Sequence, residues 1–151
     1  MREGQLPVVR FFVDANIVVY SALECPRQAA CLDILRAIAG GGAEGYMSTA
    51  ALEEVWHLEL SGKAGPLDGL TRRAHAIFSP LLAVTDEAFR YAFSIVSSGI
   101  GTNDRIHAGT CAVNGIEAIC TADAAFDRVA GLRRIDPLDE SAVAELIARD
   151  G

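Results

Sequence analysis

The stretch VVRFFVD, at residues 8–14, decides the fold class because it is short, almost continuously apolar, and rich in β-branched and aromatic residues. Such a run predicts a strand that is buried on both faces, which is typical of a parallel sheet covered by helices. The run ends in a carboxylate, Asp14. Because an unpaired buried charge is costly, Asp14 is the first candidate for a functional residue.

The rest of the chain alternates between strand-like and helix-like segments. The further strands or extended segments are expected over residues 45–49, 81–85, 117–123 and 132–136, the last at a sheet edge. The helices are expected over residues 28–39, 51–60, 67–78, 86–99, 104–114 and 139–149. This alternation predicts βαβ units and a largely parallel sheet with helices on both faces. We expect one domain over residues 1–151, since no repeat or linker interrupts the pattern.

Two of these helices carry more specific expectations. Thr85 is expected to cap the helix that begins at residue 86. That helix should bury five apolar side chains, those of Ala88, Phe89, Ala92, Phe93 and Val96, and end near Gly99. Thr102 or Asn103 is expected to cap the helix that carries Asp104.

Composition and charge limit the classes of function. No apolar run reaches the roughly 18 residues of a membrane span, and the first residues lack a signal peptide's apolar stretch, so we expect a cytoplasmic protein without a membrane partner. Twenty acidic and 13 basic residues give a net charge of −7, which argues against a broad basic surface for nucleic acid. The four cysteines form no CxxC pair, and the three scattered histidines are interpreted as structural.

Acidic residues gather where a parallel sheet binds its ligands, outside the carboxyl ends of its strands. Asp14 and Asp123 follow predicted strands, Glu53 and Glu54 lie just inside the helix after residues 45–49, and Asp104 opens a helix. Crowded carboxylates repel one another unless a cation neutralises them, and oxygen ligands suit Mg²⁺ or Mn²⁺. A metal held in this way can polarise a phosphoryl oxygen and activate water, even in an acidic protein.

Each acid taken alone also has an ordinary structural interpretation. Asp104 would suit the first turn of a helix, Asp123 an Asx turn, and Glu54 a solvated helix face. The conjunction of all four carboxylates, rather than any one of them, indicates a site.

The quoted motifs resemble those of the PIN-domain ribonucleases, in particular the toxin half of a VapBC-type toxin–antitoxin pair. The resemblance runs from about Val9 to Pro137 and rests on FFVDANIVVYSA (11–22), STAALEEVWH (48–57), GTNDRIHAGTCAVNG (101–115) and ICTADAAFDRVAGLRRIDP (119–137). In the family the helix Glu stands six positions after a small hydroxyl residue, which favours Glu54, counted from Ser48, over Glu53.

The resemblance implies a three-layer α/β/α sandwich with a central parallel sheet of four to five strands. It implies that Asp14, Glu54, Asp104 and Asp123 ligate one or two Mg²⁺ or Mn²⁺ ions and serve as the catalytic carboxylates. It implies nearby accessory groups on Asn16, Thr49, Asn103 and Thr121. It further implies hydrolysis of RNA by metal-activated water, a homodimer, and an antitoxin that blocks the site.

Further expectations concern RNA contacts and the alternative functions. Arg105 and Arg128 lie near the motifs and are candidates to contact the RNA backbone, although ordinary surface roles fit them too. An aspartyl-nucleophile phosphohydrolase would also place Asp14 after its first strand. Its second acid is missing, however, and Lys63, the only lysine, lies in a glycine-flanked loop. A catalytically inactive PIN fold that serves as an interaction module is the other alternative.

Overall fold

The computed structural model describes residues 8–147 and places a four-stranded, fully parallel sheet at the centre of the fold. The strands are β1 (Arg10–Val13), β2 (Glu44–Tyr46), β3 (Ala118–Cys120) and β4 (Arg133–Ile135), in the order β2-β1-β3-β4. This confirms the predicted parallel sheet of four to five strands and the edge position of β4.

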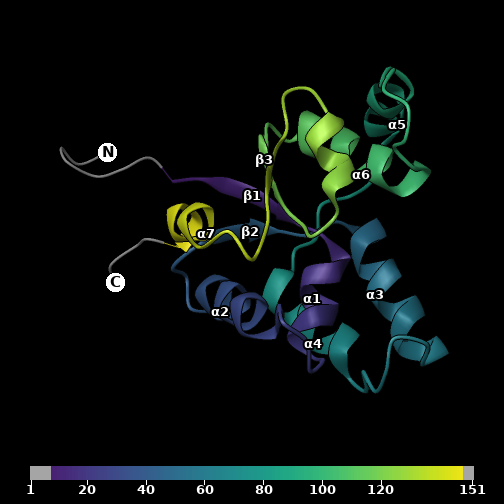
Figure 1. The fold of residues 1–151 in the computed structure, drawn as a ribbon. Helices are drawn as coiled ribbons and strands as arrows, with labels where there is room; N and C mark the ends of the chain where they lie inside the picture. The colour runs from purple at the N-terminus through teal and green to yellow at the C-terminus, as the bar shows by residue number, and fades with distance from the viewer. Residues whose placement is uncertain (1–7, 148–151) are drawn as a thin grey trace.

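Helices cover both faces of the sheet, as the three-layer expectation requires. Their bounds are α1 (Ala15–Ser21), α2 (Gln28–Ala39), α3 (Thr49–Ser61), α4 (Leu70–Phe78), α5 (Asp86–Phe93), α6 (Thr102–Val113), the 3₁₀ helix η1 (Ala124–Arg128) and α7 (Glu140–Ile147). In Figure 1, α1 to α4 lie on one side of the strands, and α5 and α6 lie on the other. No helix within residues 8–147 is long and apolar enough to cross a membrane.

The core lies around the two central strands. Phe11, Phe12 and Val13 of β1 are fully buried, as are Ile119 and Cys120 of β3. Burial of both faces explains why these strands are nearly continuous apolar runs rather than alternating ones. Because Asp14 directly follows β1, this packing fixes the position of its backbone at the carboxyl edge of the sheet.

Helix α1 is not predicted by the sequence pattern. Its segment contains Ile17, Val18 and Val19, whose branched side chains lower helix propensity. All three are buried in the structure, and Asp14 caps the helix by accepting a hydrogen bond from the backbone of Ala15. Tertiary packing and the cap therefore outweigh the local preference, and they place Asp14 at a strand-to-helix junction.

Helix α5 is shorter than predicted, although Thr85 caps it as expected. It ends at Phe93 rather than near Gly99, and the side chains of Phe93 and Val96 are 79% and 96% exposed instead of buried. Phe89 is also partly exposed, at 39%. The reason lies in the next segment, residues 94–101, where Arg105 donates hydrogen bonds to the backbone carbonyls of Ile95, Ser97 and Ile100. A side chain thus satisfies carbonyls that a longer helix would have satisfied.

Three further expectations concern residues 81–85 and the ends of α6 and α7. Residues 81–85 form an extended segment, one of the two forms expected for them, with a single parallel bridge from Leu82 to Ser48. Helix α6 begins at Thr102 with Gly101 as its cap, so neither Thr102 nor Asn103 caps it. Asp139 caps α7, as its hydrogen bond from Ala142 shows, while the predicted end of that helix at Arg149 lies outside the described residues.

Candidate metal centre

Asp14 is the most constrained carboxylate of the site. It is 5% exposed, and its Oδ1 accepts a hydrogen bond of 2.7 Å from the backbone of Ala15. Its Oδ2 accepts one of 2.8 Å from the Thr121 hydroxyl. Burial raises the pKa of the Asp14 carboxyl above its usual value, against the opposing effects of His107 and of the Thr121 hydrogen bond. The strand end thus presents a buried carboxylate whose two oxygens are both held by hydrogen bonds.

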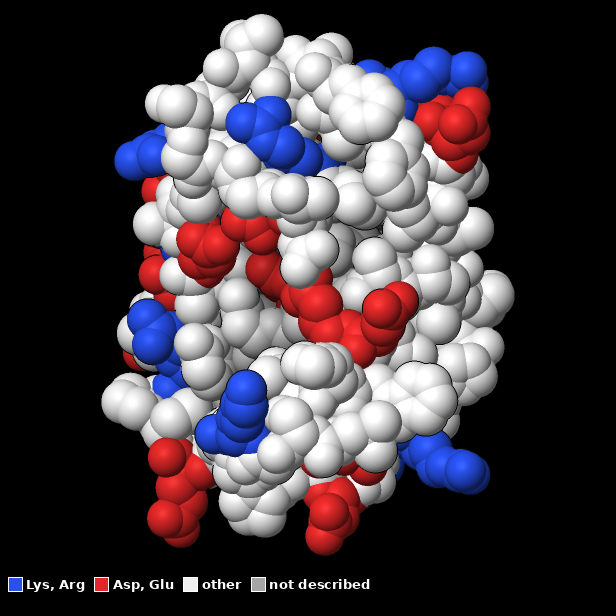
Figure 2. Space-filling view, turned by 90° about the vertical axis from the view of Figure 1, so that its right-hand side faces the viewer, with Lys and Arg blue, Asp and Glu red and all other residues white. Residues whose placement is uncertain are grey.

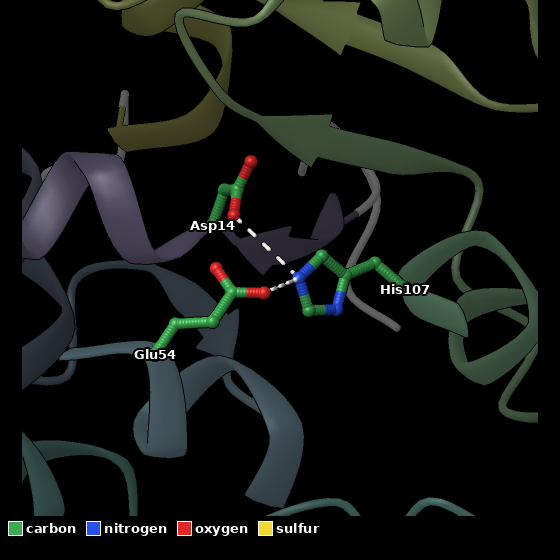
Figure 3. Close-up of side chains that lie close together, drawn as sticks. All are labelled: Asp14, Glu54 and His107. Atoms are coloured by element: carbon green, nitrogen blue, oxygen red, sulfur yellow. Dashed lines mark hydrogen bonds and ion pairs between the residues drawn. The ribbon is translucent and has the colours of Figure 1, made fainter. Parts of the chain in front are cut away.

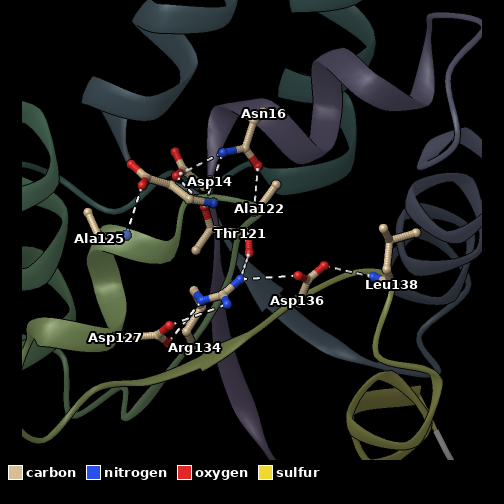
Figure 4. Close-up of polar contacts among 10 residues, drawn as sticks. Asp14, Asn16, Thr121, Ala122, Ala125, Asp127, Arg134, Asp136 and Leu138 are labelled. Atoms are coloured by element: carbon tan, nitrogen blue, oxygen red, sulfur yellow. Dashed lines mark hydrogen bonds and ion pairs between the residues drawn. The ribbon is translucent and has the colours of Figure 1, made fainter.

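Asn16 and Thr121 join the ends of β1 and β3 around Asp14, as Figure 4 shows. The Asn16 amide donates to Thr121 Oγ1 at 3.0 Å and to Asp14 Oδ2 at 3.3 Å, and its carbonyl oxygen accepts from the backbone of Ala122. Thr121 is fully buried and also accepts from the backbone of Asp123. Two of the four predicted accessory residues, Asn16 and Thr121, therefore lie in one network with Asp14.

Glu54 reaches the same place from α3, where it meets an unpredicted partner. Its Oε1 lies 3.1 Å from Nε2 of His107, and the same nitrogen lies 3.7 Å from Asp14 Oδ1 (Figure 3). Burial opposes the charged form of His107, but the hydrogen bond to Glu54 and the charge of Asp14 outweigh it, so that the pKa of His107 is raised.

Asp104 and Asp123 form a second pair of carboxylates beside the first. Asp104 lies in the first turn of α6, and Asp123 caps η1 by accepting from the backbone of Ala125. The pKa of Asp104 is raised to about 7, mainly by burial. Hydrogen bonding to Asp123 and the negative charges of Asp123 and Asp14 add to this rise. The four predicted carboxylates are thus brought to one edge of the sheet as two adjacent pairs, Asp14 with Glu54 and Asp104 with Asp123.

Within residues 8–147, the other predicted residues make no hydrogen bond to the four carboxylates. Thr49 and Asn103 line a cavity of about 650 Å³ that Glu53 and Glu54 also line, and within residues 8–147 neither side chain hydrogen-bonds to a predicted ligand. The guanidinium of Arg105 is occupied by the 94–101 segment, and that of Arg128 lies 3.4 Å from the carbonyl oxygen of Ser98. An RNA contact by either arginine remains a prediction.

Sequence reasoning missed His107, which was interpreted as a scattered structural histidine. Its signal is its spacing, because it follows Asp104 by three residues and therefore lies on the same face of α6, one turn later. Sequence reasoning also missed Arg134 of β4. Its guanidinium pairs with Asp127 at 2.9 Å and with Asp136 at 3.3 Å, and it donates to the carbonyl oxygen of Thr121 (Figure 4). Arg134 thereby ties the strand end that carries Thr121 to η1.

The chemistry of the donor set fits a divalent cation. Single ligand atoms of Asp14, Glu54 and His107 lie within 4.8 Å of one another. Burial, together with neighbouring carboxylates, raises the pKa values of Asp14 and Asp104. Carboxylate oxygens suit Mg²⁺ and Mn²⁺. Figure 2 shows acidic side chains in a band across the middle of one face of the molecule, with basic side chains above and below it.

Comparisons with known proteins agree with this architecture. The crystal structure of VapBC2 from Rickettsia felis, bound to a DNA fragment from their promoter, matches with a TM-score of 0.64 and 16% identity over 84% of this chain and 98% of that chain. The crystal structure of FitAcB from Neisseria gonorrhoeae matches with a TM-score of 0.60 and 20% identity over 85% and 99%. A comparison with curated proteins finds no significant match.

The family model of the PIN domain matches residues 11–132, which include the four predicted carboxylates and the strands that present Asp14 and Asp123. The match covers most of the chain and most of the segments on which the resemblance rests, up to residue 132 of the last one. The protein therefore belongs to the PIN domain family.

Proposed function

We propose that this protein is a metal-dependent ribonuclease that hydrolyses RNA phosphodiester bonds, and that it is the toxin of a VapBC-type toxin–antitoxin pair. The proposal is supported by membership of the PIN domain family and by the likeness of its fold to VapBC2 and FitAcB. The observation that carries it is the convergence of Asp14, Glu54, Asp104 and Asp123 at the carboxyl edge of the sheet.

In this proposal, Asp14, Asp104 and Asp123 hold Mg²⁺ or Mn²⁺, and Glu54 completes the set. The ion would supply positive charge to a phosphodiester oxygen and lower the pKa of a water molecule, with no covalent protein intermediate. The chain's own contribution is orientation. Thr121 fixes one oxygen of Asp14 through a 2.8 Å hydrogen bond, and the N-terminal amide of α1 fixes the other.

The net charge of −7 limits how RNA binds in this proposal. Two divalent ions would add +4 to −7 and leave a net charge of about −3 by simple counting. Binding should therefore depend on the metal and on locally placed arginines, and it should be lost when a chelator removes the metal.

An antitoxin and a second copy of the chain are the proposed protein partners, in a cytoplasmic setting. Large apolar side chains are exposed on α3 and at or just after the end of α5, namely Trp56, Leu60, Phe93 and Val96. Exposed apolar side chains are typical of interaction sites, which supports a protein partner without choosing between the two. Light scattering should report a dimer, and a monomer at working concentration would contradict the homodimer.

The test is cleavage of a labelled RNA by the Asp14→Asn variant in the presence of Mn²⁺ or Mg²⁺. Asparagine preserves the size of the side chain and removes its charge, so cleavage should collapse while the fold survives. Asp33→Asn, which changes an exposed aspartate of α2, is the matched control and should cleave like the wild type. Undiminished cleavage by Asp14→Asn would overturn the proposed function.

A further inference from the structure

We propose that His107 is a positioning residue of this site, whose Nε2–H holds the Glu54 carboxylate beside Asp14. This inference rests on the proposed function in so far as it assigns those carboxylates to a metal. His107 itself is not placed among the ligands. Its role is to fix the direction of one of them.

The geometry places the imidazole behind the two carboxylates. His107 is 1% exposed and comes from α6, while Glu54 comes from α3 and its side chain is 30% exposed. Figure 3 shows Nε2 pointing at both carboxylates, with the closer contact, 3.1 Å, to Glu54. Glu54 also lines the open cavity beside α3, so without this contact its flexible side chain is free to turn toward solvent.

The partners of His107 determine where its proton lies. Both atoms that face Nε2 are carboxylate oxygens, which only accept hydrogen bonds when ionised, so Nε2 carries the hydrogen. The other ring nitrogen, Nδ1, is buried and has no hydrogen-bond partner within residues 8–147. Because only one end of the imidazole is satisfied, the hydrogen bond to Glu54 fixes the ring in a single orientation.

The surroundings of His107 indicate why an imidazole rather than an aliphatic side chain is needed. Its ring packs against the ring of Phe12, with 5.2 Å between the two ring centroids, and Ala108 and Cys111 are buried on the same helix. An aliphatic residue would fill this space without leaving a buried nitrogen unpartnered. An aliphatic residue would lack the Nε2 donor, which is the contribution of His107 to the site.

The first test uses NMR on the metal-free chain with labelled histidines. The chain has three histidines, so the slowly exchanging Nε2–H signal of His107 can be assigned by its loss in His107→Gln. Glu54→Ala should shift this signal or make it exchange rapidly, whereas Glu53→Ala, a change at the exposed neighbour, should leave it unchanged. An Nε2–H signal whose position and exchange are unchanged in Glu54→Ala overturns the proposal.

The second test compares Mn²⁺ affinity by calorimetry among three variants whose folding is checked by circular dichroism. His107→Gln keeps a donor near the position of Nε2 and should stay within about threefold of the wild type. His107→Asn places its donor near Nδ1, and His107→Leu has none, so each should bind about 10-fold or more weakly. Equal loss in His107→Gln and His107→Leu, or wild-type affinity in His107→Leu, overturns the proposal.

These tests separate the role of His107 from the proposed function. The NMR comparison needs neither metal nor RNA. A chain that binds Mn²⁺ but cleaves no RNA, or that binds no Mn²⁺, would contradict the proposed function, and the NMR result would still decide whether His107 holds Glu54.

Discussion

Replacing Thr121 by valine tests the network that fixes Asp14. Thr121 is fully buried and sits between three polar partners, because its hydroxyl donates to Asp14 and accepts from Asn16 and from the backbone of Asp123. Valine has nearly the same shape and lacks the hydroxyl. The substitution therefore removes these hydrogen bonds while it leaves the packing of β3 unchanged.

The magnitude follows from the partners. A hydrogen bond to a charged group contributes about 1.5–3 kcal/mol. Asn16 retains a 3.3 Å contact with Asp14, and the backbone of Asp123 is partly accessible to water, so little further loss is expected. We expect Thr121→Val to lower the free energy of unfolding by about 2–3 kcal/mol, which corresponds to about 4–12 °C in Tm for a chain of this size.

The assay is urea and thermal unfolding of the metal-free protein, with Thr121→Ser as the control. Serine keeps the hydroxyl and loses one methyl group, so it should cost only about 1 kcal/mol. Since the Thr121 hydrogen bond lowers the pKa of Asp14, Thr121→Val should also raise that pKa further, which NMR titration can measure. Wild-type stability in Thr121→Val, or a larger loss in Thr121→Ser, would show that the Thr121 hydroxyl does not stabilise Asp14.

Two further predictions concern the scaffold. Hydrogen bonds from Thr71, and then from the backbone of Gly69, lower the pKa of Glu59 below its usual 4.5. The ionised Glu59 therefore stabilises the folded state at neutral pH, and this contribution is lost as the pH falls below about 4.5. The Tm of Glu59→Gln should therefore lie below that of the wild type at pH 7 and approach it in acid; a constant difference would contradict this. Arg105→Met should lower the free energy of unfolding by about 2 kcal/mol by freeing three carbonyls, whereas Arg90→Met, at an exposed ion pair, should have little effect. Unchanged stability with weaker RNA binding in Arg105→Met would instead support an RNA contact.

The parts of the fold that sequence predicts well are those with a strong local pattern. The apolar run 8–14 predicts β1 because burial on both faces leaves no place for polar side chains. Helix α1 escapes prediction because its β-branched residues are stabilised by packing that local preference does not report. The end of α5 escapes it because Arg105, twelve residues beyond Phe93, satisfies the carbonyls of the following segment.

The same distinction applies to the candidate site. Asp14 and Asp123 can be placed from sequence because each directly follows a predicted strand, and the parallel topology brings such strand ends together. The role of His107 cannot be read in the same way. Its partners, Glu54 and Asp14, are 53 and 93 residues away, so only the packing of α3 and α6 around β1 reveals the contact.

We propose that the carboxylates at the edge of the sheet form a metal-dependent ribonuclease site. The most direct measurement is cleavage of a labelled RNA by the purified wild-type chain before chelation, after removal of divalent ions by EDTA, and after restoration of Mn²⁺ in excess. Cleavage should disappear with EDTA and return with Mn²⁺. Cleavage that persists in EDTA, or that is absent in all three conditions, would contradict it.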